Sequence, residues 1–190
     1  PPGLPSDTPA WPSVTFSTGQ SWSAVAQTFG KIVDGRIAGD DVRAALPKLP
    51  EGASRERIIA ALSDRLHERV RYTGVEFGEA AWIPRKPSET LKSGFGDCKD
   101  KAAVLIAMLG VAGIDAHLAL LNTGPGPDLE PELPGLGMFD HAIVYVPGEQ
   151  PLWVDATDPW ARAGQLPAAD QKRYALIIGN EDYVSFQPDL

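Results

Sequence analysis

Gly94-Phe95-Gly96-Asp97-Cys98-Lys99-Asp100-Lys101, followed by the apolar run 102–109, is the stretch around which this sequence is organised. It holds the only cysteine, at the point where a glycine-punctuated polar turn gives way to an uninterrupted helical segment. Asp97 is a preferred N-cap type, and nothing in 99–109 breaks a helix. We therefore predict that Cys98 lies in the first turn of a buried helix, where free backbone amides and the helix dipole favour a thiolate.

Two interpretations of Cys98 follow from this position. A lone cysteine often serves as a small buried hydrophobe, but such a residue is expected inside the apolar run rather than between Asp97 and Lys99. The alternative is a nucleophile whose thiol faces solvent in an accessible groove. That interpretation requires a histidine base elsewhere in the chain.

Length and charge limit the classes of protein that the sequence fits. A chain of 190 residues with 43% hydrophobic content supports one well-formed core, so we expect a Pro-rich extended lead-in at 1–20 and one domain at 21–190. A formal net charge of −8 argues against a nucleic-acid partner. Apolar stretches are too short for membrane insertion. The chain begins with Pro1, and we expect it to be a piece of a longer protein with flanking domains.

Apolar residues at steps of three and four predict two helices before the cysteine. The first begins at Ser21, is ended by Gly35, and has Ile32 on its apolar face. The second covers residues 54–70. It contains His67 among charged neighbours, which we interpret as a solvated helical histidine.

A second region of interest lies after the cysteine helix, in a predicted antiparallel hairpin. Strand-like runs at 139–146 and 152–157 flank a Pro/Gly turn. If the turn centres on Gly148, His141 opposes Asp155, and if it centres on Glu149 the two are diagonal neighbours. Either way they share a face, because the side-chain period of a strand is two. His117, in a predicted strand at 114–122, is interpreted as a structural histidine.

The hairpin supplies the groups that a cysteine nucleophile needs. His141 would take the thiol proton, and Asp155 would hold the imidazole and stabilise its charged form. Two other carboxylates are alternative partners of His141. Asp140 points to the opposite face of its strand, and Asp158 falls in a turn before Pro159. Asp155 is therefore the preferred partner.

Four segments of this chain resemble the bacterial transglutaminase-like family, over roughly Ser21 to Asp158. More closely, the chain is similar to the branch whose members carry a domain of unknown function ahead of this core and are usually exported. The resemblance implies an α+β, papain-like fold with N-terminal helices, in which a central cysteine helix packs on an antiparallel sheet bearing the histidine and aspartate. The four segments are Tyr72-Thr73-Gly74-Val75-Glu76-Phe77, Gly96-Asp97-Cys98-Lys99-Asp100-Lys101, Phe139-Asp140-His141 and Trp153-Val154-Asp155-Ala156-Thr157.

The same resemblance implies roles for individual residues. The family's catalytic triad corresponds to Cys98, His141 and Asp155, with no cofactor and no metal. A tryptophan ahead of the cysteine assists the oxyanion in cross-linking members, and Trp82 is the candidate for that position; the alternative is a tryptophan that caps the core. Family members include cross-linkers, peptidases, amidases and inactive proteins, and the exported branch implies a periplasmic or extracellular location.

Three functional hypotheses follow. The leading one is cysteine-dependent acyl transfer or hydrolysis at amide bonds of a protein or peptide. The alternative is a non-catalytic binding or scaffolding module that retains the fold within a larger envelope protein. A metal site formed by Cys98, His141 and Asp155 is the third, and it is disfavoured because the paired Cys or His spacing of zinc sites is missing from the sequence.

Overall fold

Helix α4 (Cys98–Val111) lies at the centre of the protein, as the sequence predicts. The computed structural model describes residues 14–49, 51–74, 81–124, 129–179 and 184–185. The Asp97 carboxylate caps α4 by accepting from the Asp100 amide at 3.1 Å. The helix ends just before Gly113, which adopts a left-handed conformation with φ of 75°. Helices α1 (Trp22–Ile37), α2 (Arg55–Arg69) and α3 (Pro87–Ser93) and strands β3 (His117–Leu121) and β4 (His141–Val146) all pack against α4.

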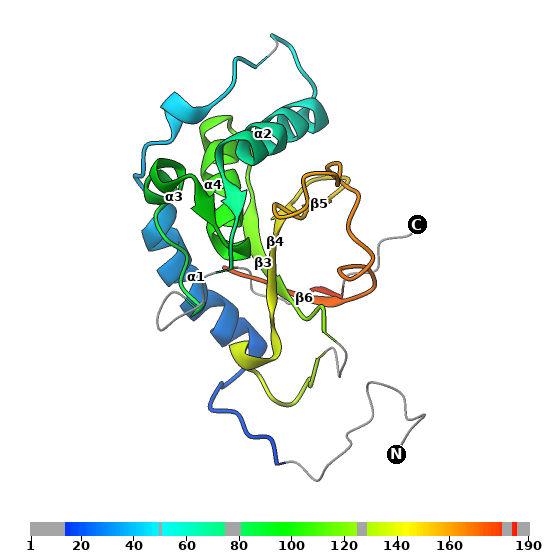
Figure 1. Ribbon diagram of the computed structural model, residues 1–190. Coiled ribbons are helices and arrows are strands. Elements are labelled where there is room, and N and C mark those ends of the chain that lie inside the picture. The colour runs from blue at the N-terminus through cyan, green and yellow to red at the C-terminus, as the bar shows by residue number, and fades with distance from the viewer. Residues whose placement is uncertain (1–13, 50, 75–80, 125–128, 180–183, 186–190) are drawn as a thin grey trace.

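An antiparallel sheet supports α4 from one side (Figure 1). Its strand order is β5-β4-β3-β6-β7, so the hairpin partners β4 and β5 lie together at one edge. The other described strands, β1 and β2, form a short parallel pair ahead of α4. The strands are β1 (Arg71–Tyr72), β2 (Phe95–Gly96), β3 (His117–Leu121), β4 (His141–Val146), β5 (Leu152–Val154), β6 (Tyr174–Ile177) and β7 (Val184–Ser185).

Three further α-helices surround α4, and both helices predicted ahead of it are present. Helix α1 runs two residues past Gly35, because an isolated glycine weakens a helix without ending it. Ile32 is exposed on α1, so its placement on the buried face was wrong. The helices are α1 (Trp22–Ile37), α2 (Arg55–Arg69) and α3 (Pro87–Ser93), with single 3₁₀ turns at Arg43–Ala45 and Leu136–Met138.

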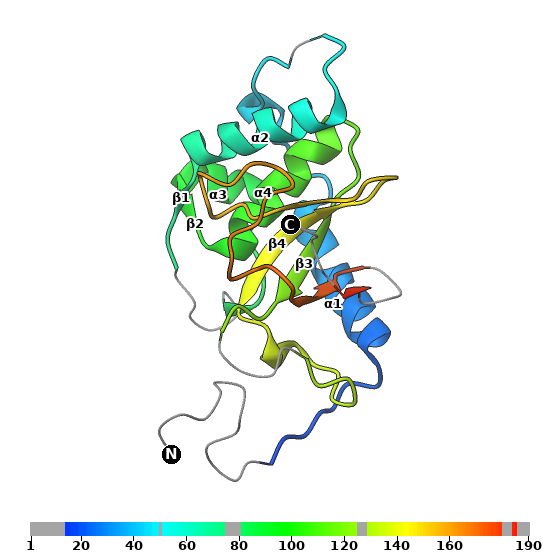
Figure 2. The same cartoon turned by 90° about the vertical axis from the view of Figure 1, so that its right-hand side faces the viewer.

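The sheet separates two apolar layers, as the period of two along each strand requires. Even-numbered residues of β4, such as Val144, face the helices and join the main core. Odd-numbered residues, such as Ile143, face the other side and pack with Leu166 and Trp153. In Figures 1 and 2 the segment that follows β5 lies on this second side, away from α1. The polypeptide after Asp155 therefore covers the sheet face opposite the helices.

Some sequence predictions fall partly or wholly outside the described residues. Residues 1–13 of the predicted lead-in and residues 75–77 of the quoted motif belong to this group. Residues 14–20 carry no helix or strand, and the domain boundary at 20/21 stays a prediction. Within the described part of the chain, none of the helices combines the length and apolar character needed to cross a bilayer.

Candidate active site

Cys98 is the first residue of α4, and its position depends on a close backbone approach. A Cβ atom placed on Gly96 would lie 2.7 Å from the Asp100 Cβ and 3.0 Å from the Thr90 Cγ2. Only glycine fits this turn without displacing the start of α4. The turn thus brings Asp97 to the N-cap and Cys98 to the end of the helix where backbone amides lack intrahelical acceptors.

The thiol is less accessible than the sequence suggested. Cys98 is 6% exposed and belongs to the main apolar core, which contradicts the expectation of a solvent-facing thiol. The reason is tertiary, because β4 packs against α4. Cys98 nevertheless lines a cavity of about 170 Å³ together with His141, Trp82 and Lys99. Its thiol is therefore reached through this cavity.

His141 and Asp155 meet as the hairpin arithmetic predicts. The register pairs Val144 with Val154 and Val146 with Leu152, so the turn centres on Glu149 and the two residues are diagonal neighbours. His141 Nε2 lies 3.3 Å from Asp155 Oδ2. The other Asp155 oxygen, Oδ1, accepts from the Thr157 amide and hydroxyl, both at 2.8 Å. Asp155 is thereby oriented toward the imidazole.

The imidazole of His141 lies between the carboxylate and the thiol. Its Nε2 forms an ion pair with Asp155, and its side chain lines the same cavity as Cys98. Burial alone would lower the pKa of His141, but the effects of neighbouring Asp155 and Cys98 outweigh burial and raise this pKa to about 10. Burial likewise opposes ionisation of Asp155, yet His141 and Thr157 hold the pKa of Asp155 below its usual range. The arrangement favours a protonated imidazole next to an ionised carboxylate.

The two alternative carboxylates, Asp140 and Asp158, accept hydrogen bonds from other residues. Asp140 Oδ1 accepts from the Thr123 amide at 2.7 Å, and Asp158 Oδ1 accepts from the Trp160 amide at 2.8 Å. Trp82 is partly exposed and lines the same cavity as Cys98. The structure thus brings Cys98, His141 and Trp82 to one cavity, with Asp155 next to His141. For Trp82, the shared lining establishes its position in this group.

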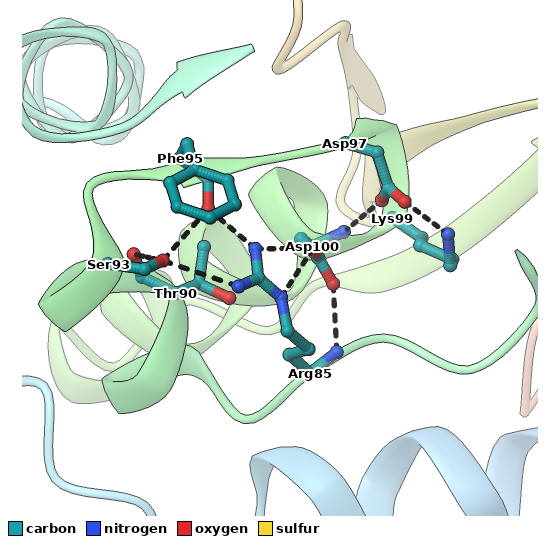
Figure 3. Close-up of polar contacts among 7 residues, drawn as sticks. All are labelled: Arg85, Thr90, Ser93, Phe95, Asp97, Lys99 and Asp100. Carbon is teal, nitrogen blue, oxygen red and sulfur yellow. Dashed lines mark hydrogen bonds and ion pairs between the residues drawn. The ribbon is translucent and has the colours of Figure 1, made fainter. Parts of the chain in front are cut away.

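Arg85 ties the Trp82 segment to the cysteine helix (Figure 3). Its backbone amide donates to Asp100 Oδ1 at 2.8 Å, and its Nε donates to Asp100 Oδ2 at 2.9 Å. The guanidinium also donates to the Phe95 carbonyl and lies 5.1 Å from the centre of the Phe95 ring. On the other side of Cys98, Lys99 forms a buried ion pair with Asp97. These contacts hold the residues on either side of Cys98 in place.

His67 lies in a different environment from the solvated helix face that the sequence predicts. It is half-buried rather than solvated, and its Nδ1 lies 3.3 Å from the Nζ of Lys101. Lys101 is almost fully buried on α4 and donates to the Val70 carbonyl at 2.8 Å. Burial lowers the pKa of Lys101 to about 8, although the negative charge of Asp155 opposes this shift. His67 is half-buried because α2 packs on α4, although its sequence neighbours on α2 are charged.

Asp170 is the site residue that sequence reasoning missed. It is a buried carboxyl beside His141 and Asp155. It lies 15 positions beyond Asp155 in a polar turn with no motif, so no local signal identifies it. His117, by contrast, lies away from this group, with its Nε2 3.3 Å from Asp115. This agrees with its interpretation as a structural histidine.

These features define a papain-like α+β protein with a cysteine at the start of its central helix. The family model of the transglutaminase-like superfamily matches residues 48–156, more than half of the chain. The chain therefore belongs to the transglutaminase-like superfamily. No curated protein matches it in sequence.

A solved structure shares this fold. It is the crystal structure of a "putative protease" from Parabacteroides distasonis, which superposes with a TM-score of 0.64 at 16% sequence identity. The match covers 90% of the present chain but only 32% of the other, so the present chain spans about a third of that protein's length. This likeness establishes the fold.

Proposed function

We propose that this domain catalyses thiol-dependent acyl transfer or hydrolysis at amide bonds of a protein or peptide. The observation that carries the proposal is the His141 side chain, which pairs with Asp155 at 3.3 Å and lines one cavity together with Cys98. A nucleophile, a base and a group that orients the base are the minimum set for this chemistry. Family membership and the fold of the "putative protease" support the same class.

The proposed reaction has two stages. The Cys98 thiolate attacks the amide carbonyl carbon, and His141 gives its proton to the departing nitrogen, so that the C–N bond breaks and a thioester forms. Water or an amine then attacks the thioester, His141 accepts the proton of the incoming group, and the C–S bond breaks. Asp155 stabilises the imidazolium in both stages. The enzyme ends as it began.

The oxyanion of each tetrahedral intermediate needs donors. The first-turn amides of α4, including that of Cys98, have no intrahelical acceptor and lie at the positive end of the helix dipole. We assign the first donor to the Cys98 amide and the second to the indole N–H of Trp82, which shares the cavity. Most of the remaining lining is apolar, as in the aromatic side chains of Phe29 and Phe139. Such a lining suits a peptide side chain.

The resemblance to the exported branch extends the proposal to the setting of the domain. We propose a periplasmic or extracellular location and flanking domains in the full-length protein. Substrates in that setting would be exported proteins or peptides.

Alkylation by iodoacetamide at a series of pH values tests the chemistry without knowledge of the substrate. An ordinary thiol with a pKa of about 8.5 reacts about 75-fold more slowly at pH 6 than at pH 8, because only the thiolate reacts. A thiolate held by a protonated His141 keeps its rate within about threefold over this range. His141→Ala restores the steep profile, and Cys98→Ala shows which residue carries the label by mass spectrometry.

The same experiment distinguishes the proposed enzyme from the alternative, which is a scaffolding module that keeps the fold without the catalytic activity. A steep profile in the wild-type protein, unchanged in His141→Ala, would favour the scaffold. If the flat profile is found, incubation with labelled amines and peptide libraries then identifies the acyl donor and shows whether water or an amine resolves the thioester.

A further inference from the structure

The polypeptide that covers the second face of the sheet places one more carboxyl at the candidate active site. Asp170 is only 2% exposed. Its amide donates to the Pro167 carbonyl at 3.0 Å, and the neighbouring Gln171 side chain donates to the Leu166 carbonyl at 2.8 Å. Leu166 itself packs in the apolar layer on that face. The turn that carries Asp170 is therefore anchored, and the carboxyl is held in place.

The neighbours of this carboxyl are themselves members of the proposed triad. One side-chain ligand atom each from Asp170, Asp155 and His141 lie within 4.8 Å of one another. Among the described residues, no donor reaches the buried Oδ2 of Asp170. Asp155 and Asp170 are thus two buried carboxyls whose oxygens approach within 4.8 Å. Two ionised carboxylates only accept hydrogen bonds, so a bond between them exists only when one carries a proton.

We propose that Asp170 is a positioning residue for the triad: it shares a proton with Asp155 and so holds the carboxylate that orients His141. This inference rests on the proposed function. The O–H of Asp170 donates to Asp155, whose Oδ1 is already occupied by Thr157. While Asp170 carries this proton, the Asp155 carboxylate is held on both sides and does not rotate away from the imidazole.

The electrostatic surroundings agree with a shared proton. Burial raises the pKa of Asp170 to about 6; the charges of Asp155 and Asp158 add to this shift, and the charge of His141 opposes it. The pKa of Asp155 is held low by His141. Two close buried carboxyls with separated pKa values retain one proton between them until the weaker acid ionises.

Two further titratable groups lie on the helix side of the pair. The charge of Asp155 opposes the lowering of the pKa by burial both for Lys101 on α4 and for His67 on α2. Above about pH 6, ionised Asp170 adds a second negative charge beside His141 and so strengthens its hold on the proton. Below that pH, protonated Asp170 acts as a hydrogen-bond donor to Asp155.

The test compares three variants by the pH dependence of iodoacetamide alkylation of Cys98. Asp170→Ala removes the donor. We expect the pH below which alkylation of Cys98 slows to rise by about one unit, so that the reaction at a given pH in this acidic range becomes about tenfold slower. Asp170→Asn keeps a permanent N–H donor of the same shape and should stay within threefold of wild type. Asp115→Asn removes an exposed carboxylate that pairs with His117 away from this group, and it serves as the control. It should stay within twofold.

Each outcome has a defined meaning. A wild-type profile on Asp170→Ala, or an Asn variant as slow as the Ala variant, overturns the positioning role while leaving the proposed function intact. An ordinary steep thiol profile in the wild type overturns both. A lower melting temperature with an unchanged profile would mark Asp170 as structural only and likewise overturns the proposal.

Carbon-13 NMR of aspartate carboxyls decides the matter if Asp170→Ala does not fold. One carboxyl signal should titrate near pH 6 in the wild type and be absent from Asp170→Asn, which still reacts with iodoacetamide. Persistence of that signal in Asp170→Asn overturns the proposal. So does stoichiometric metal in the purified wild type that is lost from Asp170→Asn, because a cation would then occupy the place of the shared proton.

Discussion

Removing the Arg85 side chain should destabilise the protein far more than removing a comparable surface arginine. Asp100 Oδ2 depends on this guanidinium, which it meets through Nε and a terminal nitrogen, both at 2.9 Å. The Asp100 side chain is 7% exposed and that of Arg85 is 31% exposed. Arg85→Ala therefore leaves one oxygen of a buried carboxylate without its partner, and only the backbone amide of residue 85 remains on Oδ1.

The magnitude follows from these contacts. Breaking a fully buried ion pair by removing one partner costs about 3–5 kcal/mol, and an exposed pair contributes about 0–1 kcal/mol. Because Arg85 is one-third exposed, we expect a loss of about 2–3 kcal/mol in the free energy of unfolding. In a chain of this length that corresponds to a fall of about 5–10 °C in melting temperature.

Urea unfolding of Arg85→Ala, Asp100→Asn and the double variant measures the coupling directly. We expect a coupling energy of about 2 kcal/mol. Arg43→Ala is the matched control, since its pair with Asp41 joins side chains that are 74% and 71% exposed. It should change stability by about 0.5 kcal/mol or less. A coupling energy for Arg85 and Asp100 as small as the control would refute the reasoning.

Three further predictions concern the same region. Gly96→Ala should destabilise by about 1–3 kcal/mol in urea unfolding, because its Cβ meets Asp100 at 2.7 Å, whereas Gly110→Ala, with no atom within 4 Å, should stabilise by about 0.5–1 kcal/mol. Nitrogen-15 NMR should find His141 protonated from pH 5 to 8, since its raised pKa of about 10 keeps the proton bound throughout; Asp155→Asn should bring the titration down toward 6.5, and an unmoved titration would contradict the ion pair. The pKa of Lys101 is lowered to about 8 in the folded protein, so between about pH 8 and 10.5 the unfolded chain keeps a proton that the folded protein has released. The free energy of unfolding should therefore rise with pH in this window. Lys101→Met should abolish that rise in urea unfolding measured at several pH values.

Local patterns predicted the cysteine helix and the hairpin because both depend on residues close in sequence. Asp97 caps α4 through the amide three positions on, which any chain with this turn can form. The shared face of His141 and Asp155 followed from strand periodicity alone. The choice between centres at Gly148 and Glu149 did not, because it depends on how β5 pairs along β4.

Burial was beyond reach of the sequence. The charged neighbours of His67 indicated a solvated helix face, but α2 packs against α4 and brings His67 next to buried Lys101. Cys98 looked accessible for the same reason, since nothing in its turn shows which strand will cover it. Local sequence records polarity, whereas exposure depends on which distant segments pack over a surface.

By itself, then, the amino-acid sequence determined the nucleophile candidate, its base and the partner of that base, along with the helix and hairpin that carry them. Only the tertiary structure decided that Cys98 and His141 line one cavity and that Asp170 lies beside Asp155. The physical reason is that caps, turns and strand faces arise from neighbouring residues. A buried carboxyl pair arises only when chain segments without any common pattern fold onto the same side of a sheet.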